Sequence, residues 1–419
     1  LWCTPTVHDV YLYKEDFTEI HTPKIIGTAS ESGSSVFELK YFDTKAYLAQ
    51  SPQFYKQMAI ASGLERVFEV APAFRAENSN TNRHCTEFTS FDLEFAYINS
   101  YEDVMHLEEE MLTYALGKLK ENFGKKTDLD IVAESWELSV HPDGPSIVAN
   151  GEYEGKTFPE YLDAAGKGVL GTKGNAFENF PILIKFIDAK GPLSIQVHPD
   201  NEYALRVEHE FGKTEMWYIM DCDPGSFLYF GVNREISKEE FEAKIKDNTL
   251  LDVLKAVPVH KGDVFFIPSG TIHAIGAGIQ ICEIQQNSNS TYRVYDFGRV
   301  GKDGKPRELH IKKALDVSNL SPIESDFKPC GPTFEKEDAK VTTMATCHEF
   351  TTYVADVDGT LTWDVDEESF GSVIVLDGSL MLEANGQSVQ LEKGQTAFID
   401  AATGNTTITG KAQFIYARV

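Results

Sequence analysis

The sequence predicts an α+β N-terminal fragment followed by a mainly β region that forms two barrels with a small helical insert. Three observations lead to this prediction. The sequence pattern changes near residue 118, short strands separated by Gly and Pro turns follow from residue 131, and one helical pattern interrupts them at 236–256. The expected domains are 1–117, 118–325 and 326–419.

The N-terminal segment mixes both kinds of element. Alternating residues predict strands at 67–70 and 88–98, and an amphipathic pattern predicts a helix at 101–119. The segment is therefore expected to be α+β and distinct from the strand-rich region that follows.

Short apolar runs dominate the chain after residue 131. In the helical insert, Ser237 precedes Glu240 by three residues, which is a capping-box pattern, and apolar residues follow at helical spacing. After Pro329 the strands resume. Strands are predicted at 182–187, 193–197, 216–220, 264–267, 279–284, 371–376, 379–382 and 413–418.

Composition narrows the class of function. The 419 residues include 38 Lys plus Arg against 65 Asp plus Glu, and the formal net charge of −27 disfavours nonspecific binding to nucleic acid. No apolar run approaches the ~20 residues of a membrane helix, and the first residues lack a signal-peptide pattern. The 6 cysteines have no close pairs, so we expect a cytoplasmic protein without a membrane span.

Four residues of metal-ligand type lie in two segments of the middle region. Gln196 and His198 are two residues apart on a predicted strand and so share one face, and Glu215 follows 17 residues later. His273 ends a stretch in which Gly and Pro shape a turn. Two imidazoles, one carboxylate and one amide suit Zn²⁺, with Mn²⁺ or Fe²⁺ as competitors. The alternative is that each histidine is a core or turn residue, as we expect for His141.

From about residue 118 to its C-terminus, the chain resembles type I mannose-6-phosphate isomerases of the short bacterial kind. The spacing of Gly262, Pro268, Gly270 and His273 is the second signature of cupin barrels. The resemblance implies two cupin-like barrels, one zinc ion per chain and a small sugar-phosphate substrate. The matching runs are 133–144, 184–200, 212–219, 262–275, 283–296 and 304–310.

The resemblance also assigns roles to residues of this chain. The family's zinc ligands match the four residues named above, its active-site lysines match Lys213 and Lys185, and its active-site arginine matches Arg293. Interconverting mannose 6-phosphate and fructose 6-phosphate through an enediol requires a Lewis acid and a proton shuttle. We expect Arg293 and Lys185 to bind the phosphate. We expect Lys213 to act as the base, because a nearby dication and burial would lower its pKa; a metal-held water is the alternative.

The final strands match the family's second cupin domain without its metal chemistry. Gly394, Asp400 and Ala402 stand where the barrel signature has Gly, Pro and Gly, and His348 is the last histidine of the chain. We therefore expect no metal ligands in 326–419 and a structural role for His348.

The segment from about residue 17 to 110 resembles class II aspartyl-tRNA synthetases of the archaeal and eukaryotic kind. The matching runs are 19–26, 47–57 and 67–94, and the last of these carries the class's second motif. The resemblance assigns Arg75 to the ATP α-phosphate and Phe88 to stacking on adenine. It also places Glu77 and His84 in the nucleotide site, and Gln53 and Lys56 where the aspartate substrate is recognised.

This second resemblance covers half of a synthetase site. The class's third motif with its ATP-binding arginine is missing, and the similar run at 276–279 lies inside the isomerase match. The first motif at 7–17 is degraded, and residues 1–117 contain 8 Lys plus Arg against 18 Asp plus Glu. We therefore expect neither aminoacylation nor a tRNA partner.

The leading hypothesis is a zinc-dependent sugar-phosphate isomerase fused to a synthetase-like fragment that is not active by itself. At the junction, residues 114–117 replace the Trp-Gly-Gly usual in the isomerase family, so we expect its first strand to be lost. The alternatives are a noncatalytic metal-binding cupin and ATP-dependent aspartate activation by the N-terminal fragment. The sequence leaves the oligomeric state open.

Overall fold

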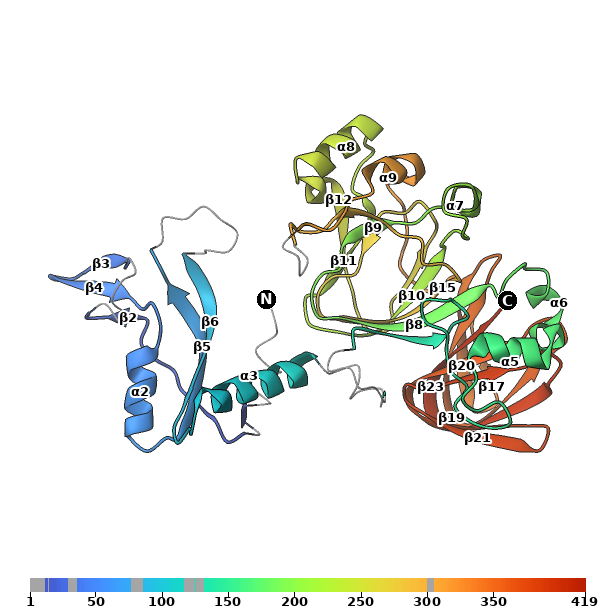
Figure 1. The fold of residues 1–419 in the computed structure, drawn as a ribbon, viewed down its shortest axis with the longest axis horizontal. Coiled ribbons are helices and arrows are strands. Elements are labelled where there is room, and N and C mark those ends of the chain that lie inside the picture. The colour runs from blue at the N-terminus through green and yellow to red at the C-terminus, as the bar shows by residue number, and fades with distance from the viewer. Residues whose placement is uncertain are drawn as a thin grey trace. The chain divides into compact units, whose positions relative to one another are not determined.

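The computed structural model describes residues 12–13, 15–28, 36–76, 86–116, 125, 132–299 and 305–419. They divide into two compact units, an N-terminal unit that ends at Leu116 and a C-terminal unit that follows it (Figure 1). Of the junction residues 114–117, at which the first isomerase strand was expected to be lost, 114–116 belong to the helix Tyr101–Leu116, and residue 117 lies outside the described residues.

In its described residues, the N-terminal unit contains two small sheets and the helices α2 and α3. Its elements are β1 (Thr18–Glu19), β2 (Ile25–Ile26), β3 (Glu38–Tyr41), β4 (Thr44–Leu48), α2 (Gln53–Ala61), β5 (Arg66–Phe74), β6 (Glu87–Phe95) and α3 (Tyr101–Leu116). In the larger sheet, β5 lies between β1 and β6, parallel to β1 and antiparallel to β6. The smaller sheet has the order β2–β4–β3.

Alternation along β5 and β6 gives the larger sheet two different faces. Phe68 and Leu93 are paired across the strands, and they pack on one face with Leu107 of α3. The other face is polar and lies beside α2. The strand predicted at 88–98 ends at Phe95, because Tyr97 has a φ of 61° that a strand does not permit.

The C-terminal unit begins with two five-stranded sheets. Its first strands are β7 (Glu134–Leu138), β8 (Ile182–Ala189), β9 (Ile195–Val197), β10 (Glu215–Cys222), β11 (Phe227–Val232), β12 (Leu254–Pro258), β13 (Val264–Ile267), β14 (His273–Ala274), β15 (Ile279–Gln286) and β16 (Tyr292–Tyr295). One sheet has the order β13–β10–β15–β8–β7, and the other has the order β12–β11–β14–β9–β16. The sheets face each other, because Phe230 of β11 and Phe265 of β13 share one apolar core.

Helices cover the outer side of the β12–β16 sheet (Figure 1). The helices of this unit are α5 (Phe158–Ala165), α6 (Gly171–Gly174), α7 (Asn201–Val207), α8 (Lys238–Lys246) and α9 (Ile311–Val317), with short 3₁₀ turns at Lys167–Leu170 and Leu250–Val253. Phe241 of α8 and Ala314 of α9 pack on Ile195 and Val197, which point away from the facing sheet.

The predicted helical insert is shorter than expected. Its N-terminus is confirmed, since the Ser237 hydroxyl accepts a hydrogen bond of 3.1 Å from the Glu240 amide. The helix ends at Lys246, and the last three residues of the predicted range, 254–256, belong to β12. Pairing with β11 therefore overrides the helical pattern there.

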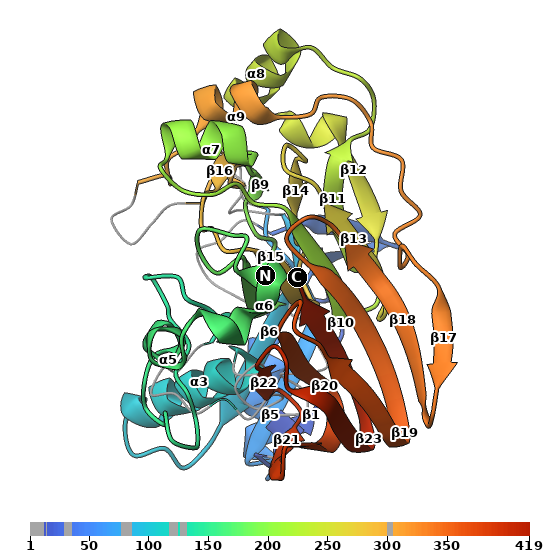
Figure 2. The same ribbon diagram turned by 90° about the vertical axis from the view of Figure 1, so that its right-hand side faces the viewer.

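A seven-stranded sheet forms the end of the chain (Figure 2). Its strands are β17 (Thr333–Lys336), β18 (Ala339–Thr346), β19 (Thr351–Val365), β20 (Gly371–Ala384), β21 (Gln387–Glu392), β22 (Thr396–Ile399) and β23 (Gly404–Arg418). The strands predicted at 371–376 and 379–382 are one strand, β20, with an irregularity between Val375 and Asp377. Phe370 and Ile415 of this region pack on Phe186 of β8, so the seven-stranded sheet covers the outer side of the β13–β7 sheet.

The expected mainly β character of the C-terminal unit is confirmed. Within the described residues, no helix is both long enough and apolar enough to cross a lipid bilayer.

Candidate metal centre

Polar side chains occupy one end of the space between the two facing sheets. Ile195 and Val197 point outward to the helices, so alternation turns Gln196 and His198 inward. His273 on β14 pairs directly with Gln196 and shares that inward side. Glu215 projects from the opposite sheet at the start of β10. Four residues far apart in sequence therefore face the same interior.

Three of these side chains form a compact buried cluster. The ligand atoms of His198, Glu215 and His273 lie within 4.8 Å of one another. His273 Nε2 is 3.1 Å from Glu215 Oε1, and His198 Nε2 is 3.6 Å from Glu215 Oε2. All three residues are at most 1% exposed. Among the residues that the structure describes, this is the one group of histidine, cysteine and carboxylate side chains with metal-site spacing.

Backbone carbonyls fix the orientation of both imidazoles. His198 Nδ1 is 2.9 Å from the Ser290 carbonyl, and His273 Nδ1 is 2.9 Å from the Thr271 carbonyl. A carbonyl oxygen can only accept, so each Nδ1 carries a proton, and each Nε2 is turned toward Glu215. This tautomer and this outer contact are typical of metal-binding histidines.

The donor set has the properties that a divalent metal requires. Glu215 Oε1 and His273 Nε2 are buried and face each other, and no described donor hydrogen-bonds to either atom. Two acceptors in contact are favourable only when a cation or proton lies between them. Burial, followed by the Lys213 ammonium, lowers the pKa of His198 well below its usual value, which keeps the imidazole in its ligand form.

The turn before His273 explains the glycine and proline spacing. Gly270 has a φ of +83°, and a Cβ there would lie 2.8 Å from the Val317 carbonyl oxygen. Its amide donates a hydrogen bond of 2.8 Å to the His198 carbonyl, and the Thr271 amide donates one of 3.1 Å to the Pro268 carbonyl. A glycine is therefore needed where the turn ties the backbones of the two histidine segments together.

Lys213 lies within this cluster. Its ammonium hydrogen-bonds to Glu215, lies 3.2 Å from His198 Nε2 and lies 3.5 Å from Glu283 Oε1. Burial lowers the pKa of Lys213, but Glu215 and Glu283 outweigh burial and raise it above the usual value. The sequence predicts a lowered pKa from burial together with a nearby dication; in the metal-free chain, the two carboxylates raise the pKa instead.

Glu283 is a site residue that the sequence reasoning missed. It is 3% exposed on β15, accepts a hydrogen bond of 2.8 Å from Trp217 Nε1, and contacts Lys213. Burial and the Glu215 charge raise the pKa of Glu283. The available signal was period-two alternation on β15, which places Glu283 inward between the outward Cys282 and Ile284.

The two other expected site residues occupy different surroundings. Arg293 pairs with Gln196, so β14, β9 and β16 place His273, Gln196 and Arg293 in one row. Arg293 Nε is buried without a described partner, and burial, followed by the Arg307 charge, lowers the pKa of Arg293. Lys185 is 5% exposed, and its ammonium lies 4.5 Å from the Trp136 ring centroid.

The expected synthetase-type residues of the N-terminal unit lie on the polar face of its larger sheet. Lys56 is 4% exposed, with its ammonium 3.3 Å from Asp92 Oδ1 and 3.7 Å from Glu94 Oε2. Gln53 donates a hydrogen bond of 3.2 Å to Glu94. These groups therefore satisfy one another internally.

The structure describes two of the four residues that were expected to contact the nucleotide. The Arg75 guanidinium lies 5.4 Å from the Phe88 ring centroid, so the two expected ATP contacts touch each other. Glu77 and His84 lie outside the described residues. The glycine run at 276–279 has a packing role, because a Cβ on Gly276 would lie 1.7 Å from the Phe227 carbonyl oxygen.

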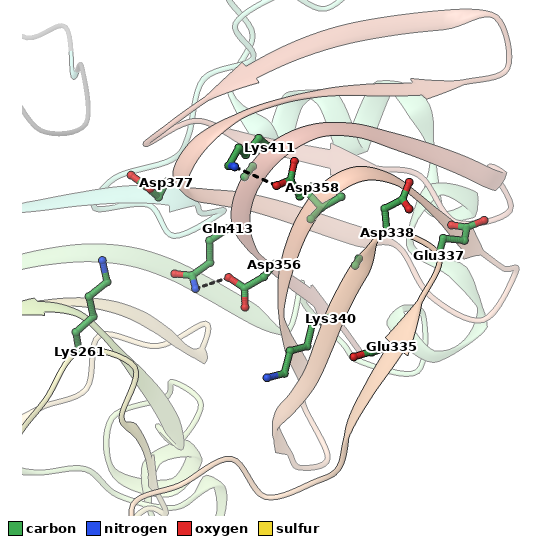
Figure 3. Close-up of a pocket in the computed structure, with 13 residues that line it drawn as sticks. Lys261, Glu335, Glu337, Asp338, Lys340, Asp356, Asp358, Asp377, Lys411 and Gln413 are labelled. Carbon is green, nitrogen blue, oxygen red and sulfur yellow. Dashed lines mark hydrogen bonds and ion pairs between the residues drawn. The ribbon is translucent and has the colours of Figure 1, made fainter.

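A surface pocket of about 590 Å³ lies elsewhere, between the seven-stranded sheet and the β12–β13 turn (Figure 3). None of the candidate metal or substrate residues lines it. Two of its carboxylates have partners within the pocket, since Lys411 contacts Asp358 at 3.0 Å and Gln413 donates to Asp356 at 2.8 Å. His348, for which a structural role was expected, has a side chain that is 81% exposed and lies against Phe177.

Comparisons with known proteins match the two units differently. The family model "tRNA synthetases class II (D, K and N)" matches residues 6–221, and "Mannose-6-phosphate isomerase, cupin domain" matches 340–419. The first range runs beyond the N-terminal unit into β7–β10, which the structure places in the facing sheets.

Individual proteins show the same division. Bacillus subtilis mannose-6-phosphate isomerase ManA is 34% identical over 295 residues, which are 70% of this chain and 91% of that protein. The crystal structure of the mannose 6-phosphate isomerase from Bacillus subtilis matches with a TM-score of 0.67 at 34% identity, covering 72% of this chain and 94% of that chain. The aspartate–tRNA(Asp) ligase of Pyrococcus abyssi is 53% identical over 168 residues, which are 38% of each protein.

Proposed function

This chain belongs to the mannose-6-phosphate isomerase family, with an N-terminal unit of the class II tRNA synthetase family, and we propose that it interconverts mannose 6-phosphate and fructose 6-phosphate. The observation that carries the proposal is the cluster of two oriented imidazoles and one buried carboxylate, with Lys213 and Glu283 beside it. In this proposal, the two facing sheets form the catalytic cupin barrel, which belongs to a domain of residues 118–325. Residues 326–419 form the second cupin domain. The protein acts in the cytoplasm.

His198, Glu215 and His273 are the proposed metal ligands, and the Gln196 amide is the fourth. Zn²⁺ is the metal that such a mixed nitrogen and oxygen set suits. A bound divalent cation supplies Lewis-acid stabilisation of the negative charge that develops on the sugar oxygens. The facing acceptor atoms of Glu215 and His273 support this assignment.

Lys213 and Glu283 are the proposed proton-transfer groups. With its pKa raised, Lys213 is protonated at neutral pH, so it is suited to donate a proton to a substrate oxygen. Glu283 is the neighbouring carboxylate whose pKa is raised, which suits a group that takes a proton from carbon. This assignment replaces Lys213 as the base.

Arg293 is the proposed phosphate-binding residue, with Lys185 in a supporting role. Adjacent strands lie ~4.8 Å apart, so the Arg293 and His273 backbones are roughly 10 Å apart, a distance that a six-carbon sugar phosphate can bridge. Arg293 retains a buried N–H without a described partner, and phosphate oxygens are suitable acceptors for it.

The test is turnover of mannose 6-phosphate by the purified full chain, with metal content determined on the same sample. We expect turnover with about one zinc per chain, and loss of more than about 100-fold in metal affinity and activity in His273→Ala. His348→Ala is the matched control, because that histidine is exposed and its described contacts are to Phe177 and Glu349, not to the proposed ligands. Metal binding without turnover would instead identify a noncatalytic metal-binding protein.

A further inference from the structure

We propose that Glu210 is a positioning residue of the metal centre, which holds the turn at 288–290 so that the Ser290 carbonyl orients the His198 imidazole. The inference rests on the proposed function, because it takes His198 as a metal ligand. Glu210 lies between α7 and β10, and it contacts none of the proposed ligands directly.

Three donors converge on the Glu210 carboxylate. The Asn289 amide donates to Oε1 at 2.8 Å, and the Ser290 hydroxyl donates to Oε2 at 2.6 Å. His141 Nε2 lies 3.1 Å from Oε1. His141 Nδ1 accepts from the Asp143 amide at 3.2 Å, so Nε2 carries the proton and donates to Glu210. The two oxygens of the Glu210 carboxylate, which can only accept hydrogen bonds, are thus matched to three donors.

The turn that Glu210 holds has one contact that leads to the metal centre. The Ser290 carbonyl accepts the His198 Nδ1 proton at 2.9 Å, in a buried setting. The other end of the turn is fixed independently, because the Ser288 hydroxyl donates to the Phe211 carbonyl at 2.8 Å and Gln285 Nε2 donates to the Ser288 carbonyl at 2.6 Å. Glu210 therefore controls the half of the turn that faces His198.

The chemistry of this position requires a carboxylate. In Glu210→Gln, one carboxylate oxygen becomes an NH₂ donor, so the side chain can no longer accept from both the Asn289 amide and the Ser290 hydroxyl. One of the two contacts that hold residues 289 and 290 is then lost or reversed, and the hold on the Ser290 carbonyl weakens. Outer contacts of this kind to a metal-binding histidine contribute about 10–100-fold in metal affinity.

The experiment compares Glu210→Gln with Glu202→Gln in the metal-free full chain. Glu202 is an exposed residue of α7 whose substitution removes the same charge without touching the turn. Zn²⁺ and Co²⁺ affinities are measured by competition with a chromophoric chelator, and the visible spectrum of the Co²⁺ form reports ligand geometry. Thermal unfolding of the metal-free proteins is recorded in parallel.

We expect Glu210→Gln to weaken metal binding about 10–100-fold and to alter the Co²⁺ spectrum, with Glu202→Gln unchanged. Unchanged affinity and spectrum in Glu210→Gln would overturn the inference, and so would a loss of metal-free stability with unaltered affinity, which would show a structural role. If the wild-type chain bound neither metal, the proposed function would fail together with this inference. Failure of Glu210→Gln alone to change binding would leave the proposed function intact.

Discussion

Each of the two units places a buried lysine between two carboxylates. In the N-terminal unit Lys56 is 4% exposed between Asp92 and Glu94, and in the C-terminal unit Lys213 is 5% exposed between Glu215 and Glu283. The surroundings of these lysines differ. The Lys56 ammonium also donates to the Leu93 carbonyl, and the Gln53 carboxamide donates to Glu94, whereas Lys213 adjoins an imidazole nitrogen that also faces a carboxylate.

This difference distinguishes an ion cluster whose charges pair with one another from a site that can bind a metal cation. Around Lys56, one cation and two carboxylates complete their own contacts, and buried pairs of this kind add little net stability. Around Lys213, two imidazoles turn their Nε2 atoms toward Glu215, and Glu215 Oε1 and His273 Nε2 have no described hydrogen-bond donor. An excess of buried acceptors, more than charge itself, marks the place where a metal cation fits.

The largest expected contrast comes from replacing each lysine by methionine. We expect Lys213→Met to lower mannose 6-phosphate turnover about 10²–10⁴-fold, because it removes the proposed proton donor. The proposed metal ligands stay in place, so metal content should remain near that of the wild type. Turnover assays combined with metal analysis check this, and retained turnover would remove Lys213 from the mechanism.

Metal removal should affect the two units unequally. A metal present at about 1,000 times its Kd stabilises the folded state by about 4 kcal/mol, and chelation removes that contribution. We expect hydrogen exchange to accelerate in β9, β10 and β14 after chelation and to stay unchanged in β5 and β6. Equal acceleration in both units would contradict the assignment of the metal to the C-terminal cluster.

The Lys56→Met variant is the counterpart of Lys213→Met. It leaves Asp92 and Glu94 without their cation, and we expect a loss of about 2–3 kcal/mol in the N-terminal unit, since those carboxylates remain 20% and 25% exposed. Isomerase turnover should change less than about twofold. Hydrogen exchange of β5 and β6 measures the first effect, and a large fall in turnover would show that the two units are coupled.

Acidification should produce the smallest effect. The pKa of His198 is lowered in the folded, metal-free chain, so below the usual histidine pKa of ~6.5 the unfolded state binds the extra proton and stability falls. We expect the free energy of unfolding to fall by up to about 1.4 kcal/mol per pH unit below pH 6.5. Unfolding is monitored by the fluorescence of Trp217, whose ring lies 5.3 Å from His273. His198→Gln should remove this contribution to the slope, and an unchanged slope would refute the buried neutral state of His198.

Local patterns in the sequence determined much of the C-terminal unit. Alternation predicted strands such as 264–267 and 279–284, the Ser237 cap predicted the start of α8, and the Gly270 turn predicted the setting of His273. These features depend on neighbours within a few residues, and such neighbours are visible in a sequence. The four proposed ligands followed from residue type and spacing for the same reason.

The tertiary structure decided the features that depend on contacts between residues far apart in the sequence. The pKa of Lys213 is raised by Glu215 and, beyond its sequence neighbours, by Glu283, which is 70 residues away and lies 3.5 Å from it; the Glu210 contact to Ser290 spans 80 residues. The end of the helical insert was decided by strand pairing, and the state of Lys56 by Asp92 and Glu94 on a separate strand. The energy of a buried charge depends on every group around it, and only the folded chain brings those groups together.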